Sequence, residues 1–452
     1  MNYINAVLWD YFFLPCVFLC GAILTVRCGF IQFRSFSKTL KCTIGSIFKN
    51  KASSDSPTAL QAASTALAST IGTGNIVGTA QAIAMGGPGA VFWLWFTALF
   101  GMVIKYAEIF LSLKFRQKQS DGTYHGGPMY YIESLGKAFV PLAWVYALFA
   151  AISAIGMGNM VQINSGVAAI CLAANQIFHI NEVRFRLIIG IILAILVFRI
   201  LSGGAKMVGK TAEVLVPIMS LVFLLATAVV LICHAQKLPQ VLEQIIVSAF
   251  QPAAIGGATV GIGVKEAMHW GIRRSAFSNE AGLGSSAIAH SSVSVKNISE
   301  HSLWGIFEVF ADTIVICTAT ALVILTSGIN IPWNSSPDPE LFKTALSTVF
   351  GDTISAIFMS FTMFSFAFAT VIAWSLYGEI CIHYLFGYKS VVIYRLIYCI
   401  CVTLGCIMST SYVWNIADLS NALMAIPNFI ALFLLSGKIV KNNNKLDDLG
   451  NE

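Results

Sequence analysis

The chain has 452 residues, of which 57% are hydrophobic and only 11% are charged, and its mean hydropathy is +0.78. These values exclude an ordinary soluble domain and indicate a polytopic membrane protein embedded in a lipid bilayer. The formal net charge of +6 does not indicate a nucleic-acid partner, because the basic residues are spread among loops between apolar segments, where membrane orientation accounts for them.

Apolar stretches recur along the chain with roughly the 20-residue length that a helix needs to cross a bilayer. The first has no basic segment before it and no small-residue cleavage site after it, so we interpret it as a retained helix. The hydropathy pattern predicts eleven transmembrane helices, at residues 5–27, 59–86, 89–114, 142–175, 186–201, 208–233, 255–292, 301–327, 349–384, 391–408 and 412–436.

Basic residues are distributed unevenly over the loops between these helices. If the N-terminus lies outside the cell, most of them fall in cytoplasmic loops and in the C-terminal tail. The outer loops then hold only Arg184, Arg186, Lys237 and Lys343. Because cytoplasmic loops carry the excess of Lys and Arg in membrane proteins, we expect a multi-pass protein of the cell membrane with an outside N-terminus and a cytoplasmic C-terminus.

Two of the predicted helices carry their own breakers. The second is interrupted at Gly72-Thr-Gly-Asn75, and the seventh is interrupted within SAFSNEAGLGSS, residues 275–286. Interrupted helices at corresponding positions of two halves are typical of transporters built from inverted repeats. This placement predicts an all-α fold and divides the chain into an extra helix with a basic loop, two five-helix repeats and a cytoplasmic tail, at residues 1–58, 59–207, 208–436 and 437–452.

Backbone groups that such a break frees need another partner, because an unpaired N–H or C=O is costly in hydrocarbon. The half-helix that begins near Gly74 and Asn75 presents N–H groups and the positive end of its dipole, which suit a carboxylate. The freed carbonyls of Ala68 and Ile71 suit a small hard cation such as Na⁺. The alternative is that the small residues only allow close helix packing.

Charged residues inside the predicted helices are a second signal, because they often mark ion or substrate pathways. Glu280 lies in the second break, and Asp312 lies early in an apolar helix. Either carboxylate could bind a cation or carry a proton. Pairing with Arg273 or Arg274 is an equally good alternative for Glu280.

Lys105 and Glu108 are a different case, because they lie three positions apart on one face of a predicted helix. At this spacing opposite charges are neighbours. We expect the two side chains to neutralise each other and to have a structural role.

Residues 204–211, GAKMVGKT, match the P-loop pattern G-x-x-x-x-G-K-[ST]. The pattern requires a preceding strand in a soluble βαβ unit, whereas here it follows a predicted transmembrane helix, so we expect no nucleotide. HExxH, GxSxG and clustered Cys/His spacings are absent from the sequence, and its eleven cysteines form no CxxC pairs. We therefore expect no enzyme activity, no organic cofactor, no disulfide framework and no Cys/His metal site.

Six blocks of sequence, among them RRSAFSNEAGLGSSAIAH and VWNIADLSNALMAIPN, resemble the alanine or glycine:cation symporter family, the sodium:alanine symporters. The GTGN and SNEAGLGS blocks are highly specific. The resemblance implies a leucine-transporter-type fold, in which one extra helix precedes an inverted five-plus-five repeat. It also implies uptake of small neutral amino acids with Na⁺, or sometimes H⁺. The blocks are residues 72–108, 121–133, 273–290, 312–328, 373–379 and 413–428.

The same resemblance implies the site residues. Gln162 and Asn164 would line the substrate pocket, but residues two apart on a helix point in different directions, and we favour Asn164, which leaves Gln162 to bond a neighbouring helix. A second ion site would use Thr70, Asn75 and Ser278. The implied substrate-binding residues are Thr73, Gly74, Asn75, Asn164, Phe277, Ser278 and Trp374, and the implied sodium ligands are Ala68, Thr70, Ile71 and Thr370.

Purely structural roles remain open for two of these residues. Trp374 could equally be a lipid-facing or packing aromatic, and Phe277 could be a gate or only a packing plug. Taken together, the sequence predicts a secondary active transporter in which Na⁺ drives symport of alanine or glycine into the cell by alternating access. The alternatives are a proton-coupled transporter of the same fold and a glutamine-preferring member.

Overall fold

The computed structural model describes residues 5, 7–43, 45, 57–119, 122–178, 180–251, 263–334, 340–408 and 410–448. The regular secondary structure of the described residues is helical apart from one short antiparallel strand pair, in which Gln117 lies opposite His125. In order, the elements are η1 (Leu8–Phe13), α2 (Leu14–Arg27), α3 (Ile31–Arg34), α4 (Phe36–Thr43), α5 (Ala59–Thr70), η3 (Gly74–Gly78), α6 (Thr79–Gly86), α7 (Gly89–Phe115), β1 (Gln117–Lys118), β2 (Tyr124–His125), α8 (Pro128–Glu133), η4 (Lys137–Phe139), α9 (Val140–Ile155), η5 (Gly156–Val161), α10 (Gln162–Phe178), α11 (Glu182–Ser202), α12 (Gly204–Cys233), η6 (Ala235–Lys237), α13 (Leu238–Phe250), α14 (Val264–Asn279), α15 (Ser285–Ser291), α16 (Ile298–Val309), η7 (Phe310–Cys317), α17 (Thr318–Ser327), α18 (Glu340–Phe350), α19 (Asp352–Phe386), α20 (Tyr388–Ile407) and α21 (Thr410–Asp448).

Nine helical segments within the described residues are long and apolar enough to cross a membrane. They match nine of the eleven predicted spans. The other two predicted spans are the broken ones, and neither half of either is long enough alone, so the count of eleven and the inverted repeat stay predictions. The nine segments are Leu8–Arg27, Gly89–Phe115, Lys137–Gln176, Glu182–Ser202, Gly204–Cys233, Ile298–Ser327, Asp352–Phe386, Tyr388–Ile407 and Ala417–Ile439.

The first predicted break is confirmed by the structure. Helix α5 starts at a capping box in which the side chains of Thr58 and Gln61 each bond the other's backbone amide, which satisfies otherwise orphaned N–H groups. It ends at Thr70, and the helical path resumes in η3 at Gly74.

The second predicted break is also present. Helix α14 ends at Asn279 and α15 begins at Ser285. Between them Gly282 and Gly284 adopt φ angles of +94° and +71°, which glycine tolerates without steric cost. Residues 255–262 of the predicted seventh span lie outside the described residues.

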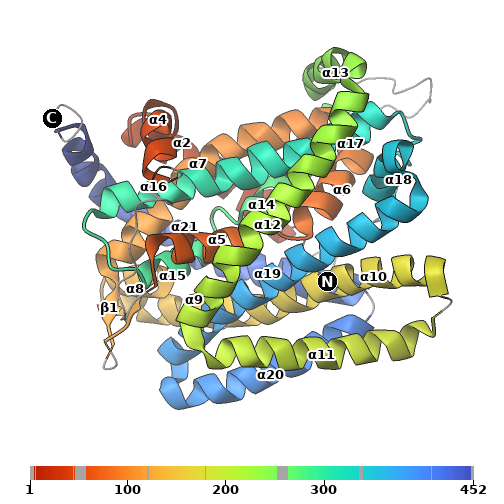
Figure 1. The fold of residues 1–452 in the computed structure, drawn as a ribbon. Coiled ribbons are helices and arrows are strands. Elements are labelled where there is room, and N and C mark those ends of the chain that lie inside the picture. Colours follow the sequence, from red (N-terminus) through yellow and green to blue (C-terminus); the bar gives the residue numbers. More distant parts are fainter. Residues whose placement is uncertain are drawn as a thin grey trace.

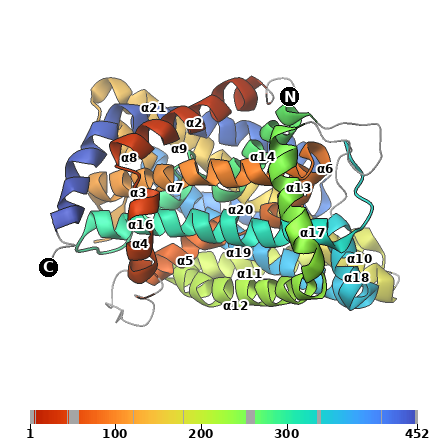
Figure 2. The same cartoon turned by 90° about the horizontal axis from the view of Figure 1, so that it is seen from above.

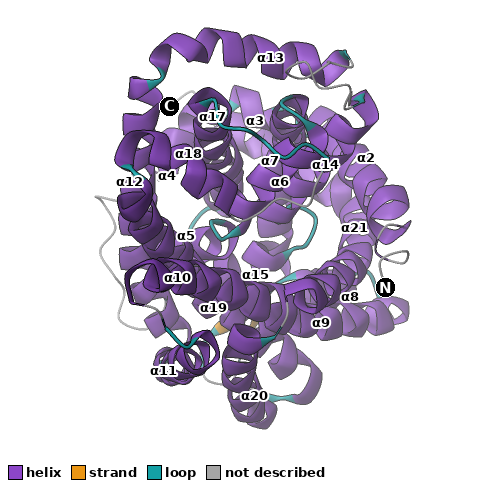
Figure 3. Ribbon diagram, turned by 90° about the vertical axis from the view of Figure 1, so that its right-hand side faces the viewer, coloured by secondary structure: helices purple, strands orange, loops and turns teal. Residues whose placement is uncertain are grey.

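Figure 1 shows the helices running roughly side by side, with β1, α8 and the C-terminus at one end and α13 and α18 at the other. Seen from above, the two ends of the chain lie at opposite ends of the bundle (Figure 2). The end-on view shows the broken helices α5 and α15 inside a ring of other helices, with α11 and α20 at the edge (Figure 3). The breaks therefore lie in the interior of the bundle.

The predicted extra helix packs along α7 and α21. Trp9 donates a hydrogen bond from Nε1 to the carbonyl of Asp418 at 3.1 Å, and Phe13 meets Phe429 edge-on at 5.6 Å between ring centroids. Several short helices lie in stretches expected to be loops, and α21 continues to Asp448, into the predicted tail. These additional helices are α3, α4, α8, α13 and α18.

Candidate functional site

Thr73, at the centre of the first break, bonds to α10. Its backbone amide and its hydroxyl both donate to Oε1 of Gln162, at 3.0 and 2.9 Å. A Cβ on Gly72 would lie 2.8 Å from Oγ1 of Thr370 and 3.0 Å from Oε1 of Gln162. Glycine at position 72 therefore lets α10 and α19 approach the unwound backbone.

The carbonyl end of the first break faces α19. Oγ1 of Thr370 donates to the carbonyl of Ala68 at 2.9 Å, although the two residues lie 302 positions apart. Ile71 is also buried, whereas the hydroxyl of Thr70 bonds back to carbonyls of its own helix, at Ala66 and Leu67. The structure thus joins Ala68 to Thr370 as expected, while the Thr70 side chain is engaged within α5.

The two breaks meet at the carboxylate of Asp312. Nδ2 of Asn75, from the first break, donates to its Oδ1 at 2.6 Å. Oγ of Ser278, from α14, donates to its Oδ2 at 2.9 Å, and the hydroxyl of Thr313 adds a third bond at 2.8 Å. All four side chains are buried. A carboxylate with several neutral oxygen-bearing neighbours is the kind of ligand set that hard cations prefer.

Glu280 and Trp374 lie together at the second break. Nε1 of Trp374 donates to Oε1 of Glu280 at 2.9 Å, and Ser69 and Ser285 donate to its Oε2. Trp374 is fully buried, which excludes the lipid-facing alternative. Its ring packs where a side chain on Gly158 would have to lie.

The alternative in which Glu280 pairs with an arginine is wrong. Arg273 instead bonds Asp418 on α21 at 2.8 Å. Arg274 is buried with its guanidinium 5.6 to 5.7 Å from the ring centroids of Trp270, Phe277 and Trp414. Arg273 therefore pairs with another carboxylate, and Arg274 packs among aromatic rings.

Phe277 lies directly against the first break. Its ring would be in van der Waals contact with a Cβ on Gly74, at 3.4 Å, and it packs against Trp414 at 5.2 Å between centroids. Phe277 is buried. It thus covers the start of η3 from the side of α14.

Contrary to the prediction, Lys105 and Glu108 do not form an ion pair with each other in the described part of the chain. Nζ of Lys105 lies 3.4 Å from Oε2 of Glu308 on α16. Oε1 of Glu108 accepts hydrogen bonds from the amides of Gly282 and Gly284, at 3.0 and 3.1 Å, and from Asn428. Glu108 therefore satisfies the amides freed by the second break. The spacing of three placed both residues near one face, but neighbouring helices offered each a better partner.

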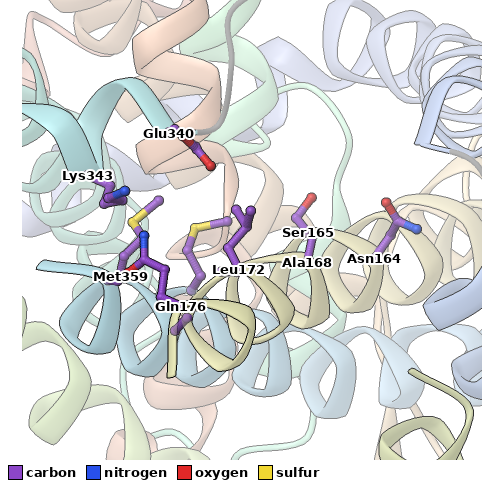
Figure 4. Close-up of a pocket in the computed structure, with 12 residues that line it drawn as sticks. Asn164, Ser165, Ala168, Leu172, Gln176, Glu340, Lys343 and Met359 are labelled. Atoms are coloured by element: carbon purple, nitrogen blue, oxygen red, sulfur yellow. The ribbon is translucent and has the colours of Figure 1, made fainter. Parts of the chain in front are cut away.

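Asn164 does not reach the break. Its Nδ2 donates to the carbonyls of Gly405 and Met408 at the end of α20. It lies at one end of a separate cavity between α10, α18 and α19, whose lining includes Glu340, Lys343 and Met359 (Figure 4). The structure thus brings Gln162 to Thr73, where the sequence interpretation had favoured Asn164.

Residues that resemble a P-loop form no loop. Gly204 to Thr211 lie in the first turns of α12, so their amides point along a helix axis instead of curving around a phosphate. The helix that precedes them, α11, takes the place of the strand that the motif requires.

From the sequence, Gln162 was a pocket candidate that was set aside in favour of Asn164, and Thr313 and Glu108 were not assigned to the site. The available signal was polarity: each is a polar residue inside an apolar helix, where an unpaired polar group is costly. Which break each side chain faces depends on how the helices rotate about their axes, and this was not readable from hydropathy.

Comparison with known proteins identifies the family of the chain. Residues 1–449 match the sodium:alanine symporter family. The chain is 38% identical to the sodium/alanine symporter AgcS of Methanococcus maripaludis over 99% of this chain and 97% of that protein. It is 33% identical to the probable sodium/glutamine symporter GlnT of Bacillus subtilis, over 96% of this chain and 87% of that protein.

Among solved structures, the chain resembles MhsT in complex with L-phenylalanine. The TM-score is 0.59 at 16% identity, covering 83% of this chain and 88% of MhsT. This likeness shows the leucine-transporter-type fold. Together with the apolar helices, the matches identify a multi-pass membrane transporter, and the chain belongs to the sodium:alanine symporter family.

Proposed function

We propose that the protein is a secondary active transporter in which Na⁺ drives the symport of a small neutral amino acid, alanine or glycine, into the cell. The observation that carries this proposal is that Asn75 of the first break and Ser278 of the second both bond the carboxylate of Asp312. Occupying such a site with a cation links the two broken helices to each other. A bound ion would thereby favour one arrangement of the helices over another, which is what coupling requires.

Two sites for Na⁺ are part of the proposal. In the first, the carbonyls of Ala68 and Ile71 and the hydroxyl of Thr370 bind the ion between α5 and α19. In the second, Asp312 binds it together with Asn75 and Ser278. The hydroxyl of Thr70, an expected ligand, donates to carbonyls of its own helix, and its oxygen would bind the ion through its remaining lone pairs.

The amino acid would bind at the start of η3. There the amides of Thr73 and Gly74 lie at the positive end of a helix dipole and suit the substrate carboxylate. Oε1 of Gln162 now accepts the Thr73 amide bond, as a carboxylate oxygen would. Phe277 and Trp374 would bound the pocket and limit the substrate side chain to a small size.

The driving force is the Na⁺ gradient together with the membrane potential. Each positive charge that moves inward gains about 2.3 kcal/mol per 100 mV. We propose that the N-terminus lies outside, and that the β1–β2 hairpin and the C-terminus lie in the cytoplasm. The excess of basic residues in the loops on that side of the membrane supports this orientation.

A proton-coupled transporter is the second candidate. It is favoured by one observation: Glu280 and Asp312 are both fully buried, and their hydrogen bonds in the described structure come from neutral groups. Either carboxylate could then carry a proton in place of a sodium ion. A glutamine substrate is a variant of the first proposal, suggested by the likeness to GlnT.

Radiolabelled uptake into liposomes that contain the purified protein tests the proposal. We expect alanine uptake that requires an inward Na⁺ gradient and is competed by glycine or serine. Uptake driven by a pH gradient in Na⁺-free buffer would favour the second candidate, and competition by glutamine alone would change the substrate. Absence of uptake for all of these amino acids under both gradients would contradict the transport proposal.

A further inference from the structure

Four ionisable side chains outside the proposed ion and substrate sites form one buried hydrogen-bonded row. Nδ1 of His290 lies 2.9 Å from Nε2 of His301, and Nε2 of His290 lies 2.5 Å from Oε1 of Glu308. Oε2 of Glu308 lies 3.4 Å from Nζ of Lys105. His301 is 7% exposed and the other three are fully buried. The row joins α15, α16 and α7.

The row can hold either of two proton numbers without losing a hydrogen bond. With both imidazoles neutral, Nε2–H of His301 donates to Nδ1 of His290, and Nε2–H of His290 donates to the Glu308 carboxylate. One added proton makes His290 cationic, so that its Nδ1–H now donates to Nε2 of His301. Each nitrogen and oxygen named keeps its partner in both states, and imidazole is the side chain that exchanges protons between about pH 5 and 8.

Access to the row is from the end of the bundle that carries the β hairpin. His301 belongs to the first turn of α16, which begins at Ile298, and it is the member of the row with an exposed fraction, 7%. A proton that binds Nδ1 of His301 from water releases the Nε2 proton to Nδ1 of His290. His301 ends neutral, and His290 ends positively charged.

We propose that His290, His301, Glu308 and Lys105 form a proton-binding site that opposes Na⁺ binding in the same bundle. Glu308 lies about one helical turn before Asp312, because α16 continues directly into η7, and Lys105 lies 3.4 Å from Glu308. When His290 becomes a cation, the row gains one positive charge beside Glu308, about one helical turn from Asp312. Positive charge added there weakens the hold on Na⁺.

Other titratable groups surround the row and would contribute to any pH response. These groups remain when a histidine of the row is replaced. The part of the pH response that such a substitution removes is therefore the part due to the row. These groups are Cys42 of α4, Tyr106, Glu108 and Arg116 of α7 and its end, Tyr124 and His125 of β2, Glu280 after α14, Asp312 of η7, and Tyr377 of α19.

The inference rests on the proposed function, and Na⁺-dependent uptake in liposomes at several pH values separates the two. In the unmodified protein we expect the Na⁺ concentration for half-maximal uptake to rise about five-fold between pH 8 and pH 6, within the usual range of coupling between sites. In His290→Asn we expect that rise to fall below about two-fold, with uptake at pH 8 retained. His234→Asn, at the end of α12, is the matched control and should keep the full response.

If His290→Asn does not yield folded protein, His301→Gln takes its place. Position 301 lies at the start of α16, and glutamine there retains a group that can form a hydrogen bond. Na⁺-dependent uptake whose pH response is the same in these variants as in the unmodified protein would overturn the proton site and leave the proposed function standing. If the unmodified protein shows no Na⁺-dependent uptake at any pH, the proposed function itself is overturned.

Discussion

Oε1 of Gln162 accepts hydrogen bonds from both the amide and the hydroxyl of Thr73, so α10 is joined directly to the unwound part of the first broken helix. Gln162 thereby occupies an acceptor position next to the amides proposed to bind the substrate carboxylate. Through this contact Gln162 lies next to the proposed binding site, whereas Asn164, two positions further along α10, bonds to the end of α20.

The first prediction follows from this contrast. When the substrate carboxylate takes over the Thr73 amide, Nε2–H of Gln162 would donate to that carboxylate, and a hydrogen bond to a charged group contributes about 1.5 to 3 kcal/mol. Gln162→Ala should therefore raise the KM for alanine about ten-fold or more. Asn164→Ala should leave KM within about two-fold and reduce thermal stability instead, since it removes the donor to the carbonyls of Gly405 and Met408. Uptake kinetics per amount of folded protein distinguish the two, and equal KM values would contradict the role of Gln162.

The second prediction concerns the ion site between α5 and α19. Thr370→Val keeps the shape of the side chain and removes its oxygen, so the Na⁺ concentration for half-maximal uptake should rise about ten-fold, equivalent to about 1.4 kcal/mol. Thr362→Val on the same helix is the control, because the Thr362 hydroxyl is buried without a partner in the described structure. An equal Na⁺ dependence in both variants would remove Thr370 from the site.

The third prediction concerns the carboxylate where the breaks meet. Asp312→Asn preserves the size and shape of the side chain and removes the negative charge, so Na⁺-dependent alanine uptake should be abolished while folded protein is still obtained. Asn75→Ala should have the same effect, because it removes the contact from the first break. Asp352→Asn, on the exposed start of α19, should transport normally. Uptake with unchanged Na⁺ affinity in Asp312→Asn would rule out this ion site.

The fourth prediction concerns the backbone of the second break. Gly284 has φ +71° and ψ 8°, and a Cβ there would collide with the ring of Pro128. Gly328 has nearly the same conformation, φ +75° and ψ 16°, but a Cβ would meet only the flexible end of Lys237. Both Ala variants suffer the left-handed strain, and the clash should cost Gly284→Ala roughly 1 to 3 kcal/mol more. Thermal denaturation of the two purified variants measures the difference, and equal midpoints would contradict the packing argument.

The fifth prediction concerns the P-loop-like motif. Lys210→Ala should leave uptake and its Na⁺ dependence unchanged, because residues 204–211 form the first turns of α12 and not the loop after a strand with which a P-loop surrounds a phosphate. ATP-dependent uptake that this substitution removes would restore the nucleotide hypothesis.

Hydropathy and glycine placement were sufficient to predict much of the architecture. Transfer of apolar side chains from water depends on local composition, so nine predicted spans have counterparts in the structure. Glycine marked both breaks in the sequence. At the second break Gly282 and Gly284 adopt positive φ angles, whereas at the first Gly72 leaves room for the side chains of Thr370 and Gln162. The family resemblance pointed to the same segments.

Only the tertiary structure decided which polar groups meet. Lys105 faces Glu308 instead of Glu108, Thr73 faces Gln162 instead of Asn164, and Asp312 receives bonds from both breaks. Each partnership joins helices far apart in sequence, and it depends on the rotation of each helix about its axis and on the low dielectric that penalises any group left unpaired. The sequence by itself therefore determined where the chain crosses and breaks, whereas the packing of the helices determined which side chains form the candidate site.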